Sequence, residues 1–263
     1  MSRLYVIGDV HNCGDDLETL LSVIQEDAND EPYKVGFIGD LIHKGPFMVK
    51  TLRLVAELYA RGTIEFIIQG NHEDLILKSP KNESDKYAKR FIFDNMSDVI
   101  TPALCLKKGA VTNVFIHGGF CRTSGKLLDH LDEIDSVPKA KAFFASLKGK
   151  QKKDFERISR VREVNPETGQ MKSFDIDNIQ PGNWPEWFVR TYTPPSYTRV
   201  VYGHEPHVLP RLTGKDGLLC LGIDTGCVYG NGLTAIVITE TENYRTLFVP
   251  SVEKYKSPLN PVT

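Results

Sequence analysis

The chain has 263 residues, of which 41% are hydrophobic and 25% are charged, and its formal net charge is −2. This balance is typical of globular proteins and excludes the disordered and fibrous classes. The near-neutral charge gives no global field that would attract nucleic acid or an anionic membrane, so a polyanion would have to be bound locally. The length permits a sizeable core, and we expect one domain over residues 1–263.

The cysteines and the N-terminal residues give an indication of the cellular compartment. Five cysteines are scattered without any C-x-x-C pair, which favours neither a disulfide framework nor a thiolate zinc site. Only four consecutive apolar residues precede Gly8, too few for a signal sequence, and no later run approaches the length of a membrane span. We therefore expect a cytoplasmic protein with no membrane segment, and the sequence indicates no obligate protein partner.

Strand-like and helical patterns alternate in the first part of the chain. Strands are expected at "LYVIGD", "KVGFIGD" and "EFIIQGN". Residues 15–27 and 47–62 place apolar side chains at helical spacing between them. Asp15 or Asp16 is expected to cap the first helix, and Gly62 to end the second. This order predicts a β-α-β-α-β unit.

The rest of the chain has a different organisation. Residues 122–198 combine helical patterns with the Pro- and aromatic-rich loop "PGNWPEWFVRTYTPPSYT", and we expect them to form a cap inserted into the domain. From about residue 199, strand-like runs follow one another with Gly-rich hairpins such as "YGNG" (229–232). An α/β start and an all-β end predict an α/β (α+β) fold of two mixed sheets packed face to face, with helices outside.

Five of the strand-like runs end at a glycine beside a residue that can bind a metal ion. In chain order these residues are Asp9 and His11, Asp40, Asn71 and His72, His117, and His204. Strand ends in layered α/β sheets are places where ligands bind. One such dipeptide is usually an ordinary satisfied polar group, but a packing explanation of all five would bury several polar groups without partners. Oxygen and imidazole ligands without cysteine favour manganese, iron or zinc, and two ions would form a clamp on phosphorus.

At these residues the chain resembles the calcineurin-like metallophosphoesterases of the phosphoprotein-phosphatase superfamily. The pattern of that superfamily is G-D-x-H, G-D-x-x-D-R-G, G-N-H-E, H-G and G-H, which here reads "GDVH", "GDLIHKG", "GNHE", "HGG" and "YGH". The later segments "RISRVREVNPETGQ", "VVYGHEP" and "GIDTGCVYGNGLTAI" are most similar to symmetrical diadenosine tetraphosphate hydrolases and ApaH-like phosphatases. The resemblance implies a four-layer fold and attack on phosphorus by a hydroxide that bridges two metal ions.

The resemblance also implies roles for individual residues. Two ligand sets share one carboxylate: Asp9, His11 and Asp40 in the first, and Asp40, Asn71, His117 and His204 in the second. His72 would donate a proton to the leaving oxygen, a role that suits a histidine whose pKa is near neutral. The two ions are expected to be manganese, with iron, zinc, cobalt or nickel as alternatives.

One departure from the family pattern concerns the residues around the substrate. His43 and Lys44 stand where the superfamily has an aspartate, which orients the catalytic histidine, and an arginine, which binds phosphate. Lys44 keeps the positive charge, but its compact ammonium group cannot bind a phosphate through two parallel hydrogen bonds as an arginine does. An additional arginine is expected from Arg160 or Arg162, which would share one face if their segment is extended. A surface ion pair is the alternative for each arginine.

These features leave several functions open. The favoured one is hydrolysis of phosphoanhydride bonds in dinucleoside polyphosphates or nucleotide-capped ends; a Ser/Thr protein phosphatase or a phosphomonoesterase acting on nucleic-acid ends is the alternative. A non-catalytic module that binds phosphorylated ligands is the third. The basic stretch 148–157 would attract a polyphosphate or an RNA 5′ end, or would be a solvated helix face. Trp184 and Trp187 would stack on a nucleobase, or would anchor their loop to the core.

Overall fold

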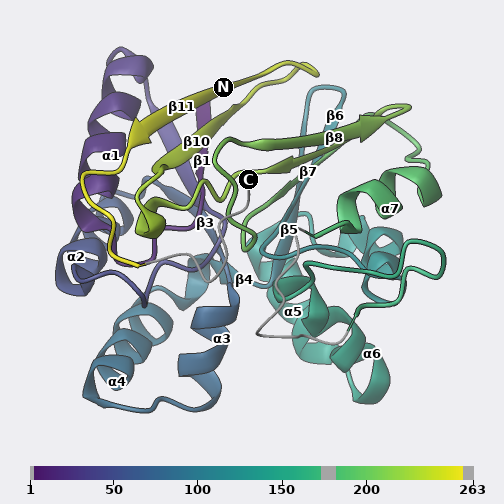
Figure 1. Cartoon of the computed structure of the whole chain (residues 1–263), viewed down its shortest axis with the longest axis horizontal. Helices are drawn as coiled ribbons and strands as arrows, with labels where there is room; N and C mark the ends of the chain where they lie inside the picture. Colours follow the sequence, from purple (N-terminus) through teal and green to yellow (C-terminus); the bar gives the residue numbers. More distant parts are fainter. Residues whose placement is uncertain (1–2, 173–181, 257–263) are drawn as a thin grey trace.

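The computed structural model describes residues 3–172 and 182–256. Two mixed sheets lie side by side in the middle of the molecule, and helices flank them on both sides (Figure 1). The strands are β1 (Arg3–Ile7), β2 (Tyr33–Phe37), β3 (Ile64–Ile68), β4 (Ile100–Thr101), β5 (Ala103–Lys108), β6 (Val111–Ile116), β7 (Thr198–Tyr202), β8 (Arg211–Lys215), β9 (Leu218–Gly222), β10 (Gly232–Ile238) and β11 (Tyr244–Pro250). The α-helices are α1 (Gly14–Ala28), α2 (Met48–Ala60), α3 (Asn71–Lys78), α4 (Glu83–Lys89), α5 (Val137–Ser146), α6 (Gly149–Phe155) and α7 (Trp184–Thr191). Short 3₁₀ or π turns are η1 (Arg90–Asp94), η2 (Ser97–Val99), η3 (Ser124–Glu133), η4 (Glu156–Ser159) and η5 (Cys227–Tyr229).

The predicted fold class is confirmed. One sheet has six strands in the order β11-β10-β1-β2-β3-β4, and the other has five in the order β5-β6-β7-β9-β8. Between the sheets, Val6, Phe66, Phe115 and Val201 are fully buried in one apolar cluster. Burial of both sheet faces explains why the central strands read as continuous apolar runs rather than alternating ones.

The first part of the chain forms the predicted β-α-β-α-β unit. Strands β1, β2 and β3 are parallel neighbours, and α1 and α2 bury their apolar stripes against the outer face of this sheet. Gly62 ends α2 with φ +65°, as expected. The predicted cap of α1 is wrong: the N-cap is Cys13, without a side-chain cap hydrogen bond. Asp15 binds Lys50 instead, and Asp16 accepts the backbone N–H of Val252.

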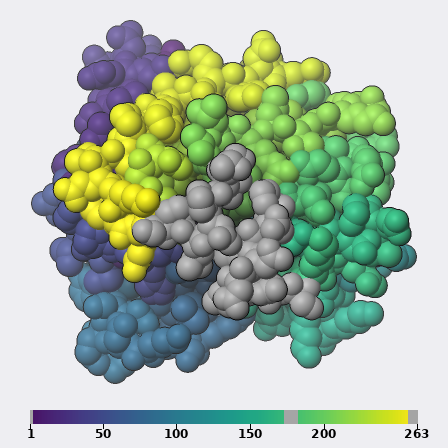
Figure 2. Space-filling model, in the orientation of Figure 1, coloured from purple at the N-terminus to yellow at the C-terminus, as the bar shows by residue number. Residues whose placement is uncertain are grey.

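The last strands divide between the two sheets. β9 belongs to the five-stranded sheet and β10 to the six-stranded one, so the chain crosses between sheets over residues 223–231. The predicted hairpin at 229–232 is therefore wrong, because the strands on its two sides do not pair. The crossing is made by η5, which ends at Gly230 with φ +87°. After β11, residues 251–256 lie against the start of α1, where the backbone N–H of Val252 donates to Asp16; Figure 2 shows these yellow residues beside the purple ones.

The described part of the predicted cap, 122–172 and 182–197, lies within the connection between β6 and β7, which are parallel, and residue 198 is the first residue of β7. A parallel pair requires a crossover, and here the crossover contains η3, α5, α6, η4 and α7. These elements share an apolar cluster with the outer face of the five-stranded sheet, so the segment is the outer helical layer of the fold. Part of the predicted loop is helical, since α7 begins at Trp184. Residues 173–181 of the segment lie outside the described residues.

Trp184 anchors this helical layer. Its side chain is fully buried, with its ring 4.7 Å from the ring of Tyr202 and 6.0 Å from that of Phe120. Trp187 is also buried, with 8% of its surface exposed. Neither ring presents a face to solvent, which favours the anchoring role over stacking on a nucleobase.

Among the described residues, the helices are too short or too polar for any of them to cross a membrane.

Candidate metal centre

The predicted site residues meet where the strands of both sheets end. In the six-stranded sheet, Asp9 and His11 follow β1, Asp40 follows β2, and Asn71 and His72 follow β3 as the first residues of α3. In the five-stranded sheet, His117 follows β6 and His204 follows β7. These strands run parallel within each sheet, so their carboxyl ends share an edge. Five separated segments therefore converge on one place.

The backbone is unusual at this edge. His11, Asp40 and His204 have positive φ values of 48°, 48° and 70°. Side-chain-bearing residues adopt this conformation at an energetic cost, and such residues cluster at functional sites. At this edge, the conformation belongs to three of the six predicted metal ligands.

Asp40 is the centre of the cluster. One carboxylate oxygen, Oδ1, lies 3.3 Å from His117 Nε2, and the other, Oδ2, lies 3.6 Å from His11 Nε2. Asn71 Oδ1 lies 3.1 Å from the same His117 nitrogen. The side chains of Asp9, His11, Asp40 and His117 are at most 3% exposed. The geometry therefore places a buried carboxylate between two sets of imidazole and oxygen groups.

Hydrogen bonds fix the tautomers of two of these histidines. His11 Nδ1 lies 3.1 Å from the carbonyl oxygen of Ile42, and His117 Nδ1 lies 2.9 Å from that of Ile38. A carbonyl can only accept, so Nδ1 donates in both rings. The neutral ring then presents the lone pair of Nε2 to the centre, which is the arrangement of metal-binding histidines in proteins.

These residues fit divalent cations. Two groups of side chains each bring their ligand atoms within 4.8 Å of one another. One group is His11, Asp40 and His72, and the other is Asp40, His117 and His204. Among the described residues, the buried atoms Asp9 Oδ1 and His204 Nδ1 have no hydrogen-bond partner. Buried polar atoms are normally satisfied, so two such atoms at one site indicate that something else binds there.

Electrostatics support the same conclusion. Burial and the neighbouring Asp224 carboxylate raise the pKa of Asp9 well above its usual value. Burial disfavours the charged form of His117, but the Asp40 and Asp9 carboxylates outweigh it and raise the pKa of His117 to about 10. The centre therefore holds excess negative charge, which a bound cation would neutralise.

Two carboxylates of the centre were absent from the predicted set. Glu73 is fully buried and accepts hydrogen bonds from the backbone N–H groups of Asp40, Leu41 and Gly70. It thus fixes the loop that carries Asp40 against the start of α3. Asp224 is buried beside Asp9 after β9, and the glycine-then-aspartate ending of "LLCLGID" is the sequence signal that could have indicated it.

His72 lies at the edge of the centre. Its Nε2 is 3.9 Å from Asp40 Oδ2, and its Nδ1 is 2.7 Å from Nδ1 of His43. Burial lowers the pKa of His72 to about 4, although the Asp40 carboxylate opposes this shift. This pKa is lower than the near-neutral value that the sequence led us to expect.

The three predicted substrate-binding residues are placed differently. Lys44 Nζ lies 2.7 Å from His11 Nε2, at the centre itself. Arg162 donates to the carbonyl oxygen of His204 at 2.9 Å. Arg160 instead pairs with Asp74 at 3.6 Å and is half exposed. The expectation that the two arginines share a strand face is wrong, because residues 160–163 form no strand.

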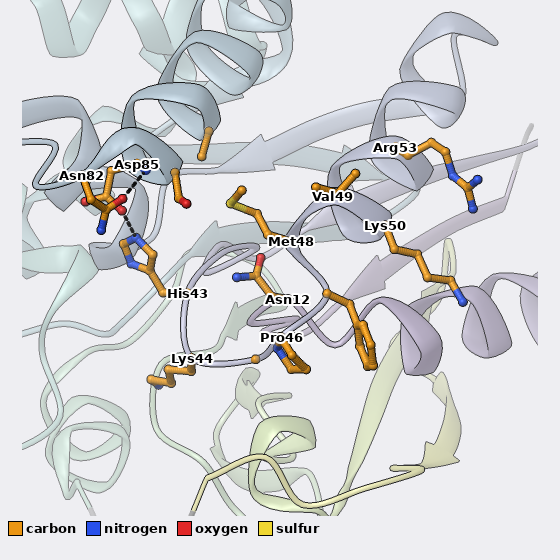
Figure 3. A pocket seen from close by; sticks show the side chains of 14 residues that line it. Asn12, His43, Lys44, Pro46, Met48, Val49, Lys50, Arg53, Asn82 and Asp85 are labelled. Carbon is orange, nitrogen blue, oxygen red and sulfur yellow. Dashed lines mark hydrogen bonds and ion pairs between the residues drawn. The ribbon is translucent and has the colours of Figure 1, made fainter.

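A cavity of about 770 Å³ adjoins the centre (Figure 3). Its wall runs from His43 and Lys44 along the start of α2 to the start of α4. His43 faces Asp85 across one end of this cavity, and a hydrogen bond joins them (Figure 3). None of the six predicted ligands lines this cavity, which meets the centre at Lys44, the lining residue that contacts His11.

The fold and this centre together define a phosphoesterase. A family model described as calcineurin-like phosphoesterase matches residues 2–208, and the chain belongs to this family. It is therefore a hydrolase that acts on phosphoesters or phosphoanhydrides, within a family whose members use divalent metal ions.

Named relatives of this chain are also hydrolases that act on phosphate compounds. The chain is 27% identical over 249 residues to an asymmetrical bis(5′-nucleosyl)-tetraphosphatase PrpE of Bacillus velezensis, covering 90% of this chain and 89% of the relative. It is 25% identical over 272 residues to a symmetrical bis(5′-nucleosyl)-tetraphosphatase of Coxiella burnetii, covering 91% and 90%. A crystal structure of a proposed diadenosine tetraphosphatase has the same fold, with a TM-score of 0.55, 20% identity, and 95% and 94% coverage.

Proposed function

We propose that this phosphohydrolase cleaves a phosphoanhydride bond of dinucleoside tetraphosphates. The observation that carries the proposal is the buried Asp40 carboxylate shared by two groups of metal-binding side chains. Relatives that match almost the whole chain are named for this substrate class. The wall of the adjoining cavity includes Lys44 and Arg53, whose positive charges suit a substrate with several phosphates; Lys50 in the same wall is paired with Asp15 and Glu18.

The residues that would hold two cations are the six predicted ligands. Asp9, His11 and Asp40 would hold one, and Asp40, Asn71, His117 and His204 the other. Bound cations would neutralise charge on the phosphoryl oxygens and make water a better nucleophile. Hard oxygen and imidazole donors without thiolate suit manganese, with iron, zinc, cobalt or nickel as alternatives.

The remaining residues act on the substrate directly. Lys44 and Arg162 place positive charge at the centre and at its rim, where they would neutralise the equatorial phosphoryl oxygens in the transition state. Arg160 would contribute after leaving Asp74. His72, whose Nε2 faces Asp40, would donate a proton to the leaving nucleotide. An anionic phosphoryl group beside this ring favours its protonated form.

Product analysis with diadenosine tetraphosphate and manganese tests the proposal. We expect hydrolysis at about 1–10³ turnovers per second, abolished by EDTA and restored by manganese, with a phosphoserine peptide left intact. Two ADP molecules would show symmetrical cleavage, and ATP with AMP asymmetrical cleavage. Hydrolysis of the peptide without hydrolysis of the dinucleotide would contradict the proposal and favour a protein phosphatase.

A further inference from the structure

His43 joins the candidate proton donor His72 to a carboxylate on another element. His43 Nδ1 lies 2.7 Å from His72 Nδ1, and His43 Nε2 lies 3.2 Å from Asp85 Oδ1. His43 belongs to the loop before α2, His72 is the second residue of α3, and Asp85 lies in the first turn of α4. The side chain of Asp85 is 8% exposed and that of His43 is 24% exposed, so water has limited access to the chain of contacts.

The carboxylate of Asp85 determines which nitrogen is the donor in each of these two hydrogen bonds. An ionised carboxylate only accepts, so His43 Nε2 carries a hydrogen that it donates to Asp85. A neutral His43 then has no hydrogen on Nδ1, which must accept from Nδ1–H of His72. Since this contact occupies the Nδ1 side of His72, its Nε2 remains the nitrogen that faces Asp40. The contacts therefore select both a ring orientation and a tautomer.

Asp85 is itself held in place. Its Oδ2 accepts the backbone N–H of Lys81 at 2.8 Å, and its own backbone N–H donates to Oδ1 of Asn82 at 2.8 Å. Burial opposes ionisation, but the hydrogen bonds from Lys81 and His43 prevail and lower the pKa of Asp85. The carboxylate is thus held as an anion, with Oδ2 bound to the backbone N–H of Lys81 and Oδ1 accepting from His43.

We propose that His43 and Asp85 are positioning residues that hold His72 as the proton donor to the leaving oxygen. The proposal rests on the proposed function. It also accounts for the departure at His43, because the anion that the family pattern supplies at this position is supplied here by Asp85 through the His43 ring. When the bond from phosphorus to the leaving oxygen breaks, that oxygen keeps the electron pair and takes the proton from Nε2 of the His72 imidazolium. The ring is left as the neutral tautomer with its hydrogen on Nδ1, which is the tautomer that His43 stabilises. Water supplies the new oxygen on phosphorus, and the proton released from water replaces the one donated, through solvent.

Two aryl esters of AMP separate this role from a structural one. A phenoxide leaving group needs a proton, whereas 2,4-dinitrophenoxide is stable without one. We expect Asp85→Asn to lower kcat for the phenyl ester by about 10–100-fold, and to change kcat for the dinitrophenyl ester by less than about threefold. Glu83→Gln is the matched control, because Glu83 is in the same turn, is 84% exposed and pairs with Lys86. It should match wild type with both esters.

A rescue variant tests the direction of the relay. Oδ1 of an aspartate occupies nearly the position of Nδ1 in a histidine ring, so His43→Asp would place a carboxylate directly against His72. The double variant His43→Asp/Asp85→Asn should recover kcat for the phenyl ester to within about fivefold of wild type. Equal losses with both esters in Asp85→Asn, or absence of rescue, would overturn the relay.

A spectroscopic measurement tests the relay without turnover. In zinc-loaded protein labelled with ¹⁵N-histidine, long-range proton–nitrogen correlation should show His43 as the Nε2–H tautomer, and Asp85→Asn should give a mixture of tautomers. His43 protonated at Nδ1 in the wild type would overturn the relay. Failure of the wild type to cleave diadenosine tetraphosphate would overturn the proposed function instead, and the tautomer would still decide the relay.

Discussion

Asp40→Asn is expected to lower kcat/KM for diadenosine tetraphosphate by at least about 10³-fold, the equivalent of several kcal/mol of lost charge stabilisation. The carboxylate lies between His11 and His117 and belongs to both candidate ligand groups. Although burial opposes its ionisation, the positive charge of His117 holds the pKa of Asp40 well below its usual value. An amide of the same shape removes the charge and leaves only one oxygen to share.

The same variant should lose metal as well as activity. Steady-state kinetics and metal analysis of the purified variant measure both effects. Asp132→Asn is the control, since Asp132 is 88% exposed and pairs only with Lys107 among the contacts described. A variant at position 40 with more than a tenth of wild-type activity and its full metal content would contradict the shared role of Asp40.

Trp184→Ala is expected to lower the free energy of unfolding by about 3–5 kcal/mol, the usual cost of removing a large buried aromatic side chain. The indole is fully buried among Phe120, Phe188 and Tyr202. Its loss opens a cavity between α7 and the five-stranded sheet, which these rings join. Because total stabilities are of the order of 5–15 kcal/mol, the variant should unfold at much lower denaturant concentration.

Denaturant unfolding followed by circular dichroism measures this loss. Trp184→Phe keeps an aromatic ring and should lose less than half as much stability. KM for diadenosine tetraphosphate should stay within about twofold in Trp184→Phe, because a fully buried ring does not reach the substrate. A large rise in KM with unchanged stability would instead support stacking of Trp184 on a nucleobase.

The sequence predicted that the six candidate ligand side chains converge, because each of them is marked locally. A buried parallel strand reads as an apolar run, and its end is marked by a glycine beside Asp9, Asp40 or Asn71. Parallel strands align their ends, so the convergence of these residues follows from the fold class. The geometry of this edge, including its positive φ values, required the structure.

Features that depend on tertiary contacts were not predictable in the same way. Asp85 lies in the short helix α4, far in the sequence from any glycine-bounded strand, and only the packing of α4 brings it to His43. Asp15 and Asp16 look like helix caps, but partners elsewhere in the chain, Lys50 and Val252, bind them instead. The segment 229–232 has hairpin composition, yet its flanking strands belong to different sheets.

Metal analysis of the purified wild-type protein, with anomalous scattering from a crystal, tests the central claim most directly. The account predicts about two transition-metal ions per chain, with two anomalous peaks at the strand ends that both lie against the Asp40 carboxylate. Protein that binds no transition metal, and a manganese-soaked crystal without a peak beside Asp40, would contradict it.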